Sequence, residues 1–386
     1  MLEKINLISN PNNISKQAER SHRVPSSVSR SISSLATRLS MVTAIVSVAA
    51  AGIMITTAKA ETPVEVSKPE QVVNIYSYRQ PFLIEPILET FTQTTGIKTQ
   101  IIFAKKGLVE RVQAEGKYSP ADIILTSDFA TLIRATDVAQ SVQSNVLNSS
   151  IPENARAADN RWFGLSWRAR VAYASRDRVK DSQISYEELA DKKWQGRICI
   201  RDGQHPYNIG LFASLIAHHG ENWTRDWLIA VRDNLAVKPS GNDRAQVRNV
   251  YAGVCDIAIG NTYYMGKMQN NTKNPEQKEW AEAVRIIFPN SETRGVHANV
   301  SGMVMAKFAP NPKPAKALME YLVSAEAQSA YASVNYEYPV QTDIKSSKQV
   351  TSWGAFNPDP ISLDTVNANS VLASKLVDKV RFNSGR

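Results

Sequence analysis

Three tyrosines follow two short apolar segments of this chain at matching distances. In "GRICIRDGQHPYN", Tyr207 comes eight residues after Cys199, and in "CDIAIGNTYYMGKM", Tyr263 comes eight residues after Cys255 and directly precedes Tyr264. Both apolar segments are typical of buried strands. If the two strands are neighbours, their carboxyl ends bring the three phenols to one edge of a sheet.

Three converging phenols suggest a hard, trivalent metal ion. A phenol has a pKa near ~10, so an isolated tyrosine is neutral at physiological pH. A bound cation changes this, because metal ligands must be deprotonated. Three phenolates would neutralise Fe(III), and a small anion such as carbonate could fill the remaining positions, whereas zinc favours Cys or His and calcium favours carboxylates. Taken alone, adjacent tyrosines at a sheet edge are more often packing residues.

Residues suited to holding an anion lie near other predicted strands. Arg79 and Gln80 follow the first strand, and Arg168 and Arg170 lie on a long extended segment. The loop 203–207 opens a helix, whose free N–H groups could also face an anion. The chain shows no phosphate-loop motif and no convincing set of nucleophile, histidine and acid, so we do not expect an enzyme.

Strands alternate with helices in two successive parts of the chain. The first part spans 71–137, and the alternation resumes over 196–220 and 246–266 after an extended segment at 161–179. This pattern predicts parallel sheets covered by helices on both faces. The stretch 246–266 is expected to run helix, strand, loop, which places Tyr263 and Tyr264 in a loop.

Two segments are expected to cross between these parts, near 167–172 and 288–301. They predict two α/β lobes joined by a hinge, with the ligand in the cleft between the lobes.

Composition and charge agree with an ordinary globular protein. The chain has 386 residues, of which 43% are hydrophobic, enough for two domains with full cores. Residues 1–60 carry seven Lys and Arg against two Glu, so five of the nine net positive charges lie there. The remaining chain is nearly balanced, which argues against a nucleic-acid partner.

The N-terminus has the pattern of an export signal. Residues 1–40 are polar and basic, and an apolar segment with small residues follows and ends in Ala58-Lys59-Ala60. We expect cleavage after Ala60 and a protein exported to a bacterial periplasm. A single membrane anchor is the alternative, since the apolar segment is nearly long enough to span a bilayer.

The two cysteines, Cys199 and Cys255, leave two possibilities open. They could form a disulfide in an oxidising compartment, or remain as two reduced thiols in the core.

Several motifs together resemble the periplasmic ferric-ion-binding proteins, the solute-binding components of bacterial ABC importers for ferric iron. The similarity covers nearly all of 71–386 and rests on "VNIYSYRQPFLIEPILETFTQTTGIK", "SPADIILTSD", "WFGLSWRARVAY", "GRICIRDGQHPYN", "CDIAIGNTYYMGKM" and "EYPV". It implies a type-II periplasmic binding protein, with two α/β lobes, a two-strand hinge and an interlobe cleft. The lobes are expected at 71–166 with 291–342, and at 167–290 with 343–386, after a signal peptide at 1–60.

The resemblance also implies the ligands of the metal. Fe(3+) would be bound by Tyr207, Tyr263 and Tyr264, with carbonate as a synergistic anion held by Arg79, Gln80 and Arg168. Many family members add a His or His-Tyr after the first strand, where this chain reads "YRQP". It therefore looks like the subgroup in which three tyrosines and carbonate complete the shell. Two further departures are Met265, where a third tyrosine is common, and Trp167, where a small polar residue is common.

The expected function is capture of ferric iron in the periplasm and its delivery to an inner-membrane ABC permease with its ATPase. The protein would act as a monomer, through closure of the two lobes over the ion. The alternative is a solute-binding protein for a small organic or anionic solute, since the same fold hosts such sites.

Overall fold

The computed structural model describes residues 71–341 and 343–385, so the predicted signal peptide at 1–60 lies outside the described residues. The strands are β1 (Val72–Ser77), β2 (Lys98–Phe103), β3 (Ile123–Thr126), β4 (Ala139–Gln140), β5 (Phe163–Ser175), β6 (Ile198–Cys199), β7 (Ile257–Asn261), β8 (Val284–Ile287), β9 (Ala298–Ala306) and β10 (Tyr338–Pro339).

The helices alternate with these strands as the sequence predicts. They are α1 (Pro81–Thr95), α2 (Leu108–Glu115), α3 (Phe129–Ala135), α4 (Asn145–Ser150), α5 (Pro206–His219), α6 (Glu221–Asp233), α7 (Asp243–Tyr251), α8 (Tyr263–Gln269), α9 (Glu276–Glu282), α10 (Pro312–Leu322), α11 (Ala325–Asn335), α12 (Lys348–Thr351), α13 (Leu363–Ala368) and α14 (Ser370–Lys379). Within residues 71–341 and 343–385, none of these helices combines the length and the apolar character that a membrane span requires.

The first helix shows how local sequence sets these boundaries. Pro81 occupies the first turn of α1, where its missing N–H costs nothing. Gly96 ends the helix in the left-handed conformation, with φ of 73°. Apolar residues at helical spacing form the buried face, namely Leu83, Ile84, Ile87, Leu88 and Phe91. The local sequence therefore sets both ends of this helix and its buried face.

The strands follow the order β2-β1-β3-β9-β5-β7-β6. β1 is parallel to β2 and β3, and β6 is parallel to β7, but β9 is antiparallel to both β3 and β5. The prediction of purely parallel sheets is therefore wrong. The chain leaves the first group of strands through β5 and returns through β9, so these two long strands run against their neighbours.

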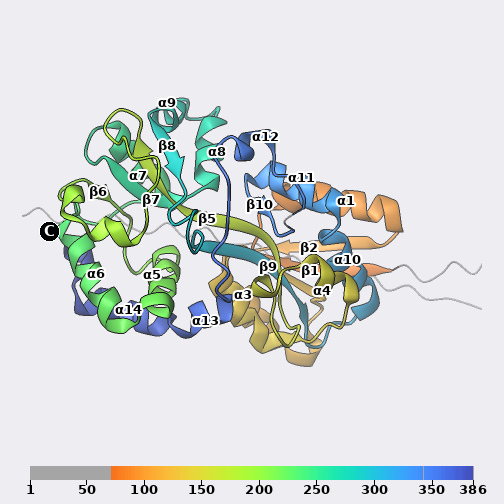
Figure 1. Ribbon diagram of the computed structural model, residues 1–386. Coiled ribbons are helices and arrows are strands. Elements are labelled where there is room, and N and C mark those ends of the chain that lie inside the picture. Colours follow the sequence, from red (N-terminus) through yellow and green to blue (C-terminus); the bar gives the residue numbers. More distant parts are fainter. Residues whose placement is uncertain (1–70, 342, 386) are drawn as a thin grey trace, which may run out of the picture. The chain divides into compact units, whose positions relative to one another are not determined.

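β5 connects the two groups of strands and all of its residues are buried. Its first part pairs with β9 as far as Ala169, and its second part pairs with β7 from Arg170 and with β8. Figure 1 shows β5 and β9 running between the β1–β2 side and the β6–β7 side. The predicted crossing near 167–172 is thus part of one continuous strand.

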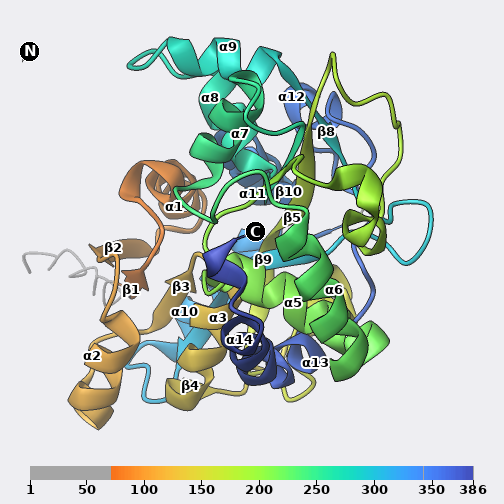
Figure 2. The same ribbon diagram turned by 90° about the vertical axis from the view of Figure 1, so that its left-hand side faces the viewer.

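The C-terminal helices pack on the β6–β7 side. α13 and α14 contact α5 and lie beside it in Figure 2. The ring centroids of Phe212 in α5 and Phe382 lie 5.5 Å apart, which fixes the chain end against this helix.

Cys199 and Cys255 form a disulfide, which settles the question that the sequence leaves open. Cys199 ends β6, and Cys255 lies two residues before β7. The bond therefore links the two parallel strands that lead to Tyr207 and Tyr263.

We expect the double variant Cys199→Ser/Cys255→Ser to unfold with a free energy roughly 2–4 kcal/mol lower than that of the wild type. The disulfide spans 56 residues of sequence, and opening it gives that loop more freedom in the unfolded chain. Urea unfolding followed by circular dichroism measures the difference. The wild type under reducing conditions should behave like the variant, and equal stability of the oxidised wild type and the variant would contradict the prediction.

Candidate metal centre

The strand ends bring the three tyrosines together. β6 and β7 are neighbours in parallel register, with Cys199 opposite Ala258. Tyr207 is the second residue of α5, and Tyr263 and Tyr264 are the first two residues of α8. The prediction that the tyrosine pair lies in a loop is therefore wrong. A helix begins directly after β7, and its first turn presents both phenols at the strand end.

The phenols form a compact group. The hydroxyl oxygens of Tyr207 and Tyr263 are 3.2 Å apart and share a hydrogen bond. The ring centroids of Tyr263 and Tyr264 are 4.3 Å apart. Tyr263 is only 6% exposed. Three phenol oxygens brought together in this way are, once deprotonated, a suitable donor set for a hard cation.

Burial keeps the phenols of Tyr263 and Tyr264 protonated in the absence of a metal. It raises the pKa of Tyr263 well above its usual value, and the neighbouring phenols of Tyr207 and Tyr264 raise it further. The pKa of Tyr264 is also raised, first by burial and then by Tyr207. A cation that binds here must displace protons, since a phenolate is the ligand form.

Several cations surround the phenol rings. The guanidinium carbon of Arg168 lies 5.7 Å from the ring centroid of Tyr263, and the Nζ of Lys267 lies 4.7 Å from the same centroid. Arg244 lies 5.4 Å from the ring centroid of Tyr264. Burial, with Arg79, Arg244 and Arg168, outweighs the opposing effect of Glu337 and lowers the pKa of Lys267 to about 8. This concentration of positive charge favours negative charge on the phenols and on any anion beside them.

The predicted anion-binding arginines share one buried carboxylate. Arg79 forms a bidentate pair with Glu337, at 2.8 and 3.1 Å. The Nε of Arg168 lies 3.8 Å from the same carboxylate, and its Nη2 donates to the backbone oxygen of Ser127. All three charged side chains are 4% exposed or less. The Nε atoms of both arginines have no hydrogen-bond partner in the described part of the chain.

Glu337 is held ionised by these arginines. Burial alone would raise its pKa, but Arg79 and Arg168 outweigh this effect and lower the pKa to about 2. Gln80, the third predicted anion contact, is the N-cap residue of α1 and is partly exposed.

Beneath the phenols, a polar network fixes the elements that carry them. Asp243 is fully buried and accepts hydrogen bonds from Arg170, at 2.7 Å, and from Arg201. It also accepts from the backbone N–H of Asn261, at 3.0 Å. Arg170 in turn donates to Asn208, the residue after Tyr207. The guanidinium group of Arg170 is thus occupied by its ion pair with Asp243.

Sequence reasoning missed Asp243, Lys267 and the role of His205. The backbone N–H of Tyr207 donates to the Nδ1 of His205, which acts as the N-cap of α5. Burial and then Arg201 lower the pKa of His205 to about 4, so the ring is neutral and able to accept this bond near neutral pH. The His-Pro pair before Tyr207 was the available signal, since Pro favours the first turn of a helix.

α8 also touches the segment that carries Glu337. Gly266 lies against the ring of Tyr336, and a Cβ atom at this position would come within 2.3 Å of that ring. Tyr336 itself has a left-handed backbone, with φ of 56°, and is followed directly by Glu337.

The arrangement defines a two-part α/β binding protein with a phenol-lined, positively charged site. Residues 118–358 match the family model described as bacterial extracellular solute-binding protein. The chain is 42% identical over 324 residues to iron uptake protein A1 of Synechocystis sp., with 83% of this chain and 89% of the relative covered.

Solved structures agree with this match. Ferric iron-binding protein A of Mannheimia haemolytica, in an open conformation, superposes with a TM-score of 0.78 at 47% identity, covering 81% of this chain and 99% of that one. A Trichodesmium protein (IdiA, FutA) in complex with iron and citrate has a TM-score of 0.78 at 38% identity, with 81% and 99% covered.

The chain belongs to the bacterial extracellular solute-binding proteins. The expected type-II periplasmic binding protein fold and the resemblance to ferric-ion-binding proteins are confirmed by these relatives. The expectation that the protein is not an enzyme is confirmed by the same family membership.

We expect Glu337 to make the stability of the protein depend on pH in the acid range. Its folded pKa of about 2 lies below the ordinary value of 4.5, so the unfolded chain takes up the proton first as the pH falls. The stability that it contributes is complete above that ordinary value and is lost as the pH falls towards about 2. Between about pH 5 and pH 2, the wild type should lose roughly 3 kcal/mol more than Glu337→Gln.

Urea unfolding at a series of pH values measures this difference. The exposed Glu326→Gln, on α11, serves as the matched control and should follow the wild type. If the curves of the wild type and Glu337→Gln run parallel through this range, the ionised state of Glu337 is not a source of stability.

Proposed function

We propose that Tyr207, Tyr263 and Tyr264 bind ferric iron as phenolates and that the protein delivers this ion for import. The observation that carries the proposal is the group of three phenols. The hydroxyl oxygens of Tyr207 and Tyr263 are 3.2 Å apart, and the ring of Tyr264 is tilted against that of Tyr263, with centroids 4.3 Å apart. The names of the relatives support iron over an organic solute, since they are an iron uptake protein and ferric iron-binding proteins.

A small anion completes the coordination shell in this proposal, and carbonate is our first candidate. Arg79, Gln80 and Arg168 are its proposed contacts. The two arginines have Nε atoms without a partner in the described chain, and Lys267 adds a further positive charge beside Tyr263. The Trichodesmium relative holds iron together with citrate. Carbonate and citrate are therefore compared directly in the test below.

Capture would proceed by closure of two lobes, 71–166 with 291–342 and 167–290 with 343–386. The change of partners along β5, from β9 to β7, supports this division. The closed, iron-loaded monomer would then dock on an inner-membrane ABC permease driven by its ATPase. The family match supports export, and cleavage of residues 1–60 after Ala60 would release the protein into the periplasm.

We expect a ferric titration of the protein to produce a visible phenolate-to-iron charge-transfer band that saturates near one iron per chain. Tyr263→Phe and Tyr264→Phe should each lower the affinity for iron by at least about 100-fold. Mutation of residues that only hydrogen-bond to metal ligands already lowers metal affinity by up to about that factor. Tyr118→Phe, on the surface at 81% exposure, is the matched control. Supplying the iron with bicarbonate or with citrate should shift the band if the anion joins the shell.

A band that survives in both tyrosine variants would contradict the phenolate site. Absence of a band under every condition would favour an organic solute instead.

Acid should release the bound iron over a narrow pH range. Burial and mutual proximity raise the pKa of Tyr263 and Tyr264, so protons compete strongly with the metal for these oxygens. As the pH falls, the logarithm of the ratio of bound to free iron should change by more than about one per pH unit, since more than one proton is taken up. Absorbance of the band measures the ratio, and circular dichroism of the metal-free protein over the same range excludes unfolding as the cause. A slope of one would mean that a single proton is taken up when iron is released, and therefore that only one phenolate binds the metal.

A further inference from the structure

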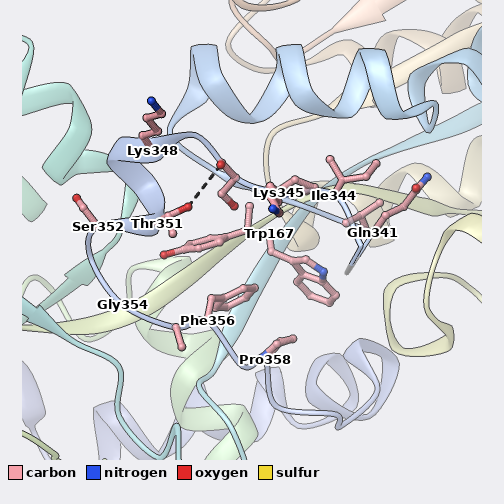
Figure 3. Close-up of a pocket in the computed structure, with 15 residues that line it drawn as sticks. Trp167, Gln341, Ile344, Lys345, Lys348, Thr351, Ser352, Gly354, Phe356 and Pro358 are labelled. Carbon is pink, nitrogen blue, oxygen red and sulfur yellow. Dashed lines mark hydrogen bonds between the residues drawn. The ribbon is translucent and has the colours of Figure 1, made fainter.

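A cavity of about 760 Å³ lies on β5 and β10, apart from the phenol group. Its lining includes the aromatic side chains of Trp167, Tyr338 and Phe356 and residues of the segment 344–352. Figure 3 shows Lys345, Lys348 and Thr351 on that segment, above the rings of Trp167 and Phe356. A cavity of this volume is within the range of small-molecule sites in proteins.

We call this space on β5 and β10 the hinge cavity, and its lining is aromatic and positively charged. Tyr338 and Phe356 are stacked, with ring centroids 4.2 Å apart, and Trp167 lies beside them. The hydroxyl of Tyr338 is buried and has no hydrogen-bond partner among the described residues. Among the lining residues that the structure describes, two are lysines and none is acidic. Aromatic faces, an unused hydroxyl donor and positive charge together fit a flat aromatic anion.

The hinge cavity and the arginine cluster share the same strands. β10 is antiparallel to β5, with Tyr338 directly opposite Trp167. Successive side chains of a strand point to opposite faces. Trp167 and Tyr338 therefore line the cavity, while their chain neighbours Arg168 and Glu337 pair with each other on the other face, where Arg168 also contacts the ring of Tyr263.

We propose that the hinge cavity is a second ligand site, which takes a small aromatic carboxylate or sulfonate and is coupled to the metal site. The coupling rests on the proposed ferric function, but binding in the cavity does not. A ligand held between β10 and the segment 344–358 fixes the position of Trp167 and Tyr338. It thereby restricts Arg168 and Glu337, whose positions determine the charge around Tyr263. By linkage, iron must then change the affinity of the cavity by the same factor.

Isothermal titration calorimetry of the metal-free protein with 2-naphthalenesulfonate tests the cavity itself. We expect one saturable site. The uncharged 2-naphthalenemethanol should bind about five-fold more weakly, because two exposed lysines contribute modestly to the attraction. Lys345→Gln/Lys348→Gln should reproduce that loss with the sulfonate, and Lys273→Gln/Lys278→Gln is the matched control with two exposed lysines elsewhere.

Two variants address the cavity walls. Ala355→Trp, at an exposed lining position, should abolish binding by filling the space. Tyr338→Phe keeps the ring but removes the unpartnered hydroxyl, and should weaken binding about five-fold. Absence of a saturable site in the wild type, or equal binding by the wild type and Ala355→Trp, would overturn the proposal.

A ferric titration with and without saturating 2-naphthalenesulfonate tests the coupling. The ferric dissociation constant should change by at least about five-fold, the lower end of ordinary coupling between sites. Ala355→Trp should show no such change. An unchanged constant in the wild type would overturn the coupling. Failure to bind iron at all would instead overturn the ferric function, while calorimetry would still decide whether the cavity binds its ligand.

Discussion

The buried ion pair of Asp243 with Arg170 supports the whole phenol group. These two side chains are 0% and 2% exposed, and their charged atoms lie 2.7 Å apart. Through Arg201, Asn208 and the N–H of Asn261, the pair connects the start of α5 to the end of β7. Removing one member of such a pair leaves an uncompensated buried charge. The pair therefore fixes the distance between the helix that carries Tyr207 and the helix that carries Tyr263.

The negative charge that the phenols would supply to a metal is absent from the metal-free site. Without a metal Tyr263 and Tyr264 are neutral, because burial raises the pKa of both side chains. The surrounding cations are Arg168, Arg244 and Lys267. Of these, Arg168 shares the carboxylate of Glu337 with Arg79, so that one negative charge serves two guanidinium groups. Ionised phenols and an anion would supply the missing negative charge.

Much of the fold could be predicted from the sequence. The matching spacing after Cys199 and Cys255 placed three tyrosines at one sheet edge, because parallel strands align their carboxyl ends. The direction of β9 could not be predicted, since an isolated apolar segment carries no information on its orientation in a sheet. The start of α8 at Tyr263 could not be predicted either. The residues before it, Asn261 and Thr262, are as common in turns as before helices.

The supporting charges were harder to predict than the phenols. Asp243 lies on α7, and its partners come from β5, β7 and the loop before α5. Nothing in the local sequence distinguishes it from a surface aspartate at the first turn of a helix. Glu337 is similar, since its partner Arg79 is 258 residues away. Such pairs become visible only when the chain is folded.

The contact of Gly266 with Tyr336 determines how closely α8 approaches the segment that carries Glu337. The helix that presents Tyr263 and Tyr264 rests on an aromatic ring whose chain neighbour is Glu337, with no side chain between them. Glycine at this point lets the backbone of the helix lie directly against the ring, where the methyl group of an alanine would force the two apart. The distance between the helix that carries the phenols and the segment that carries the shared carboxylate is therefore set by a contact of backbone with ring.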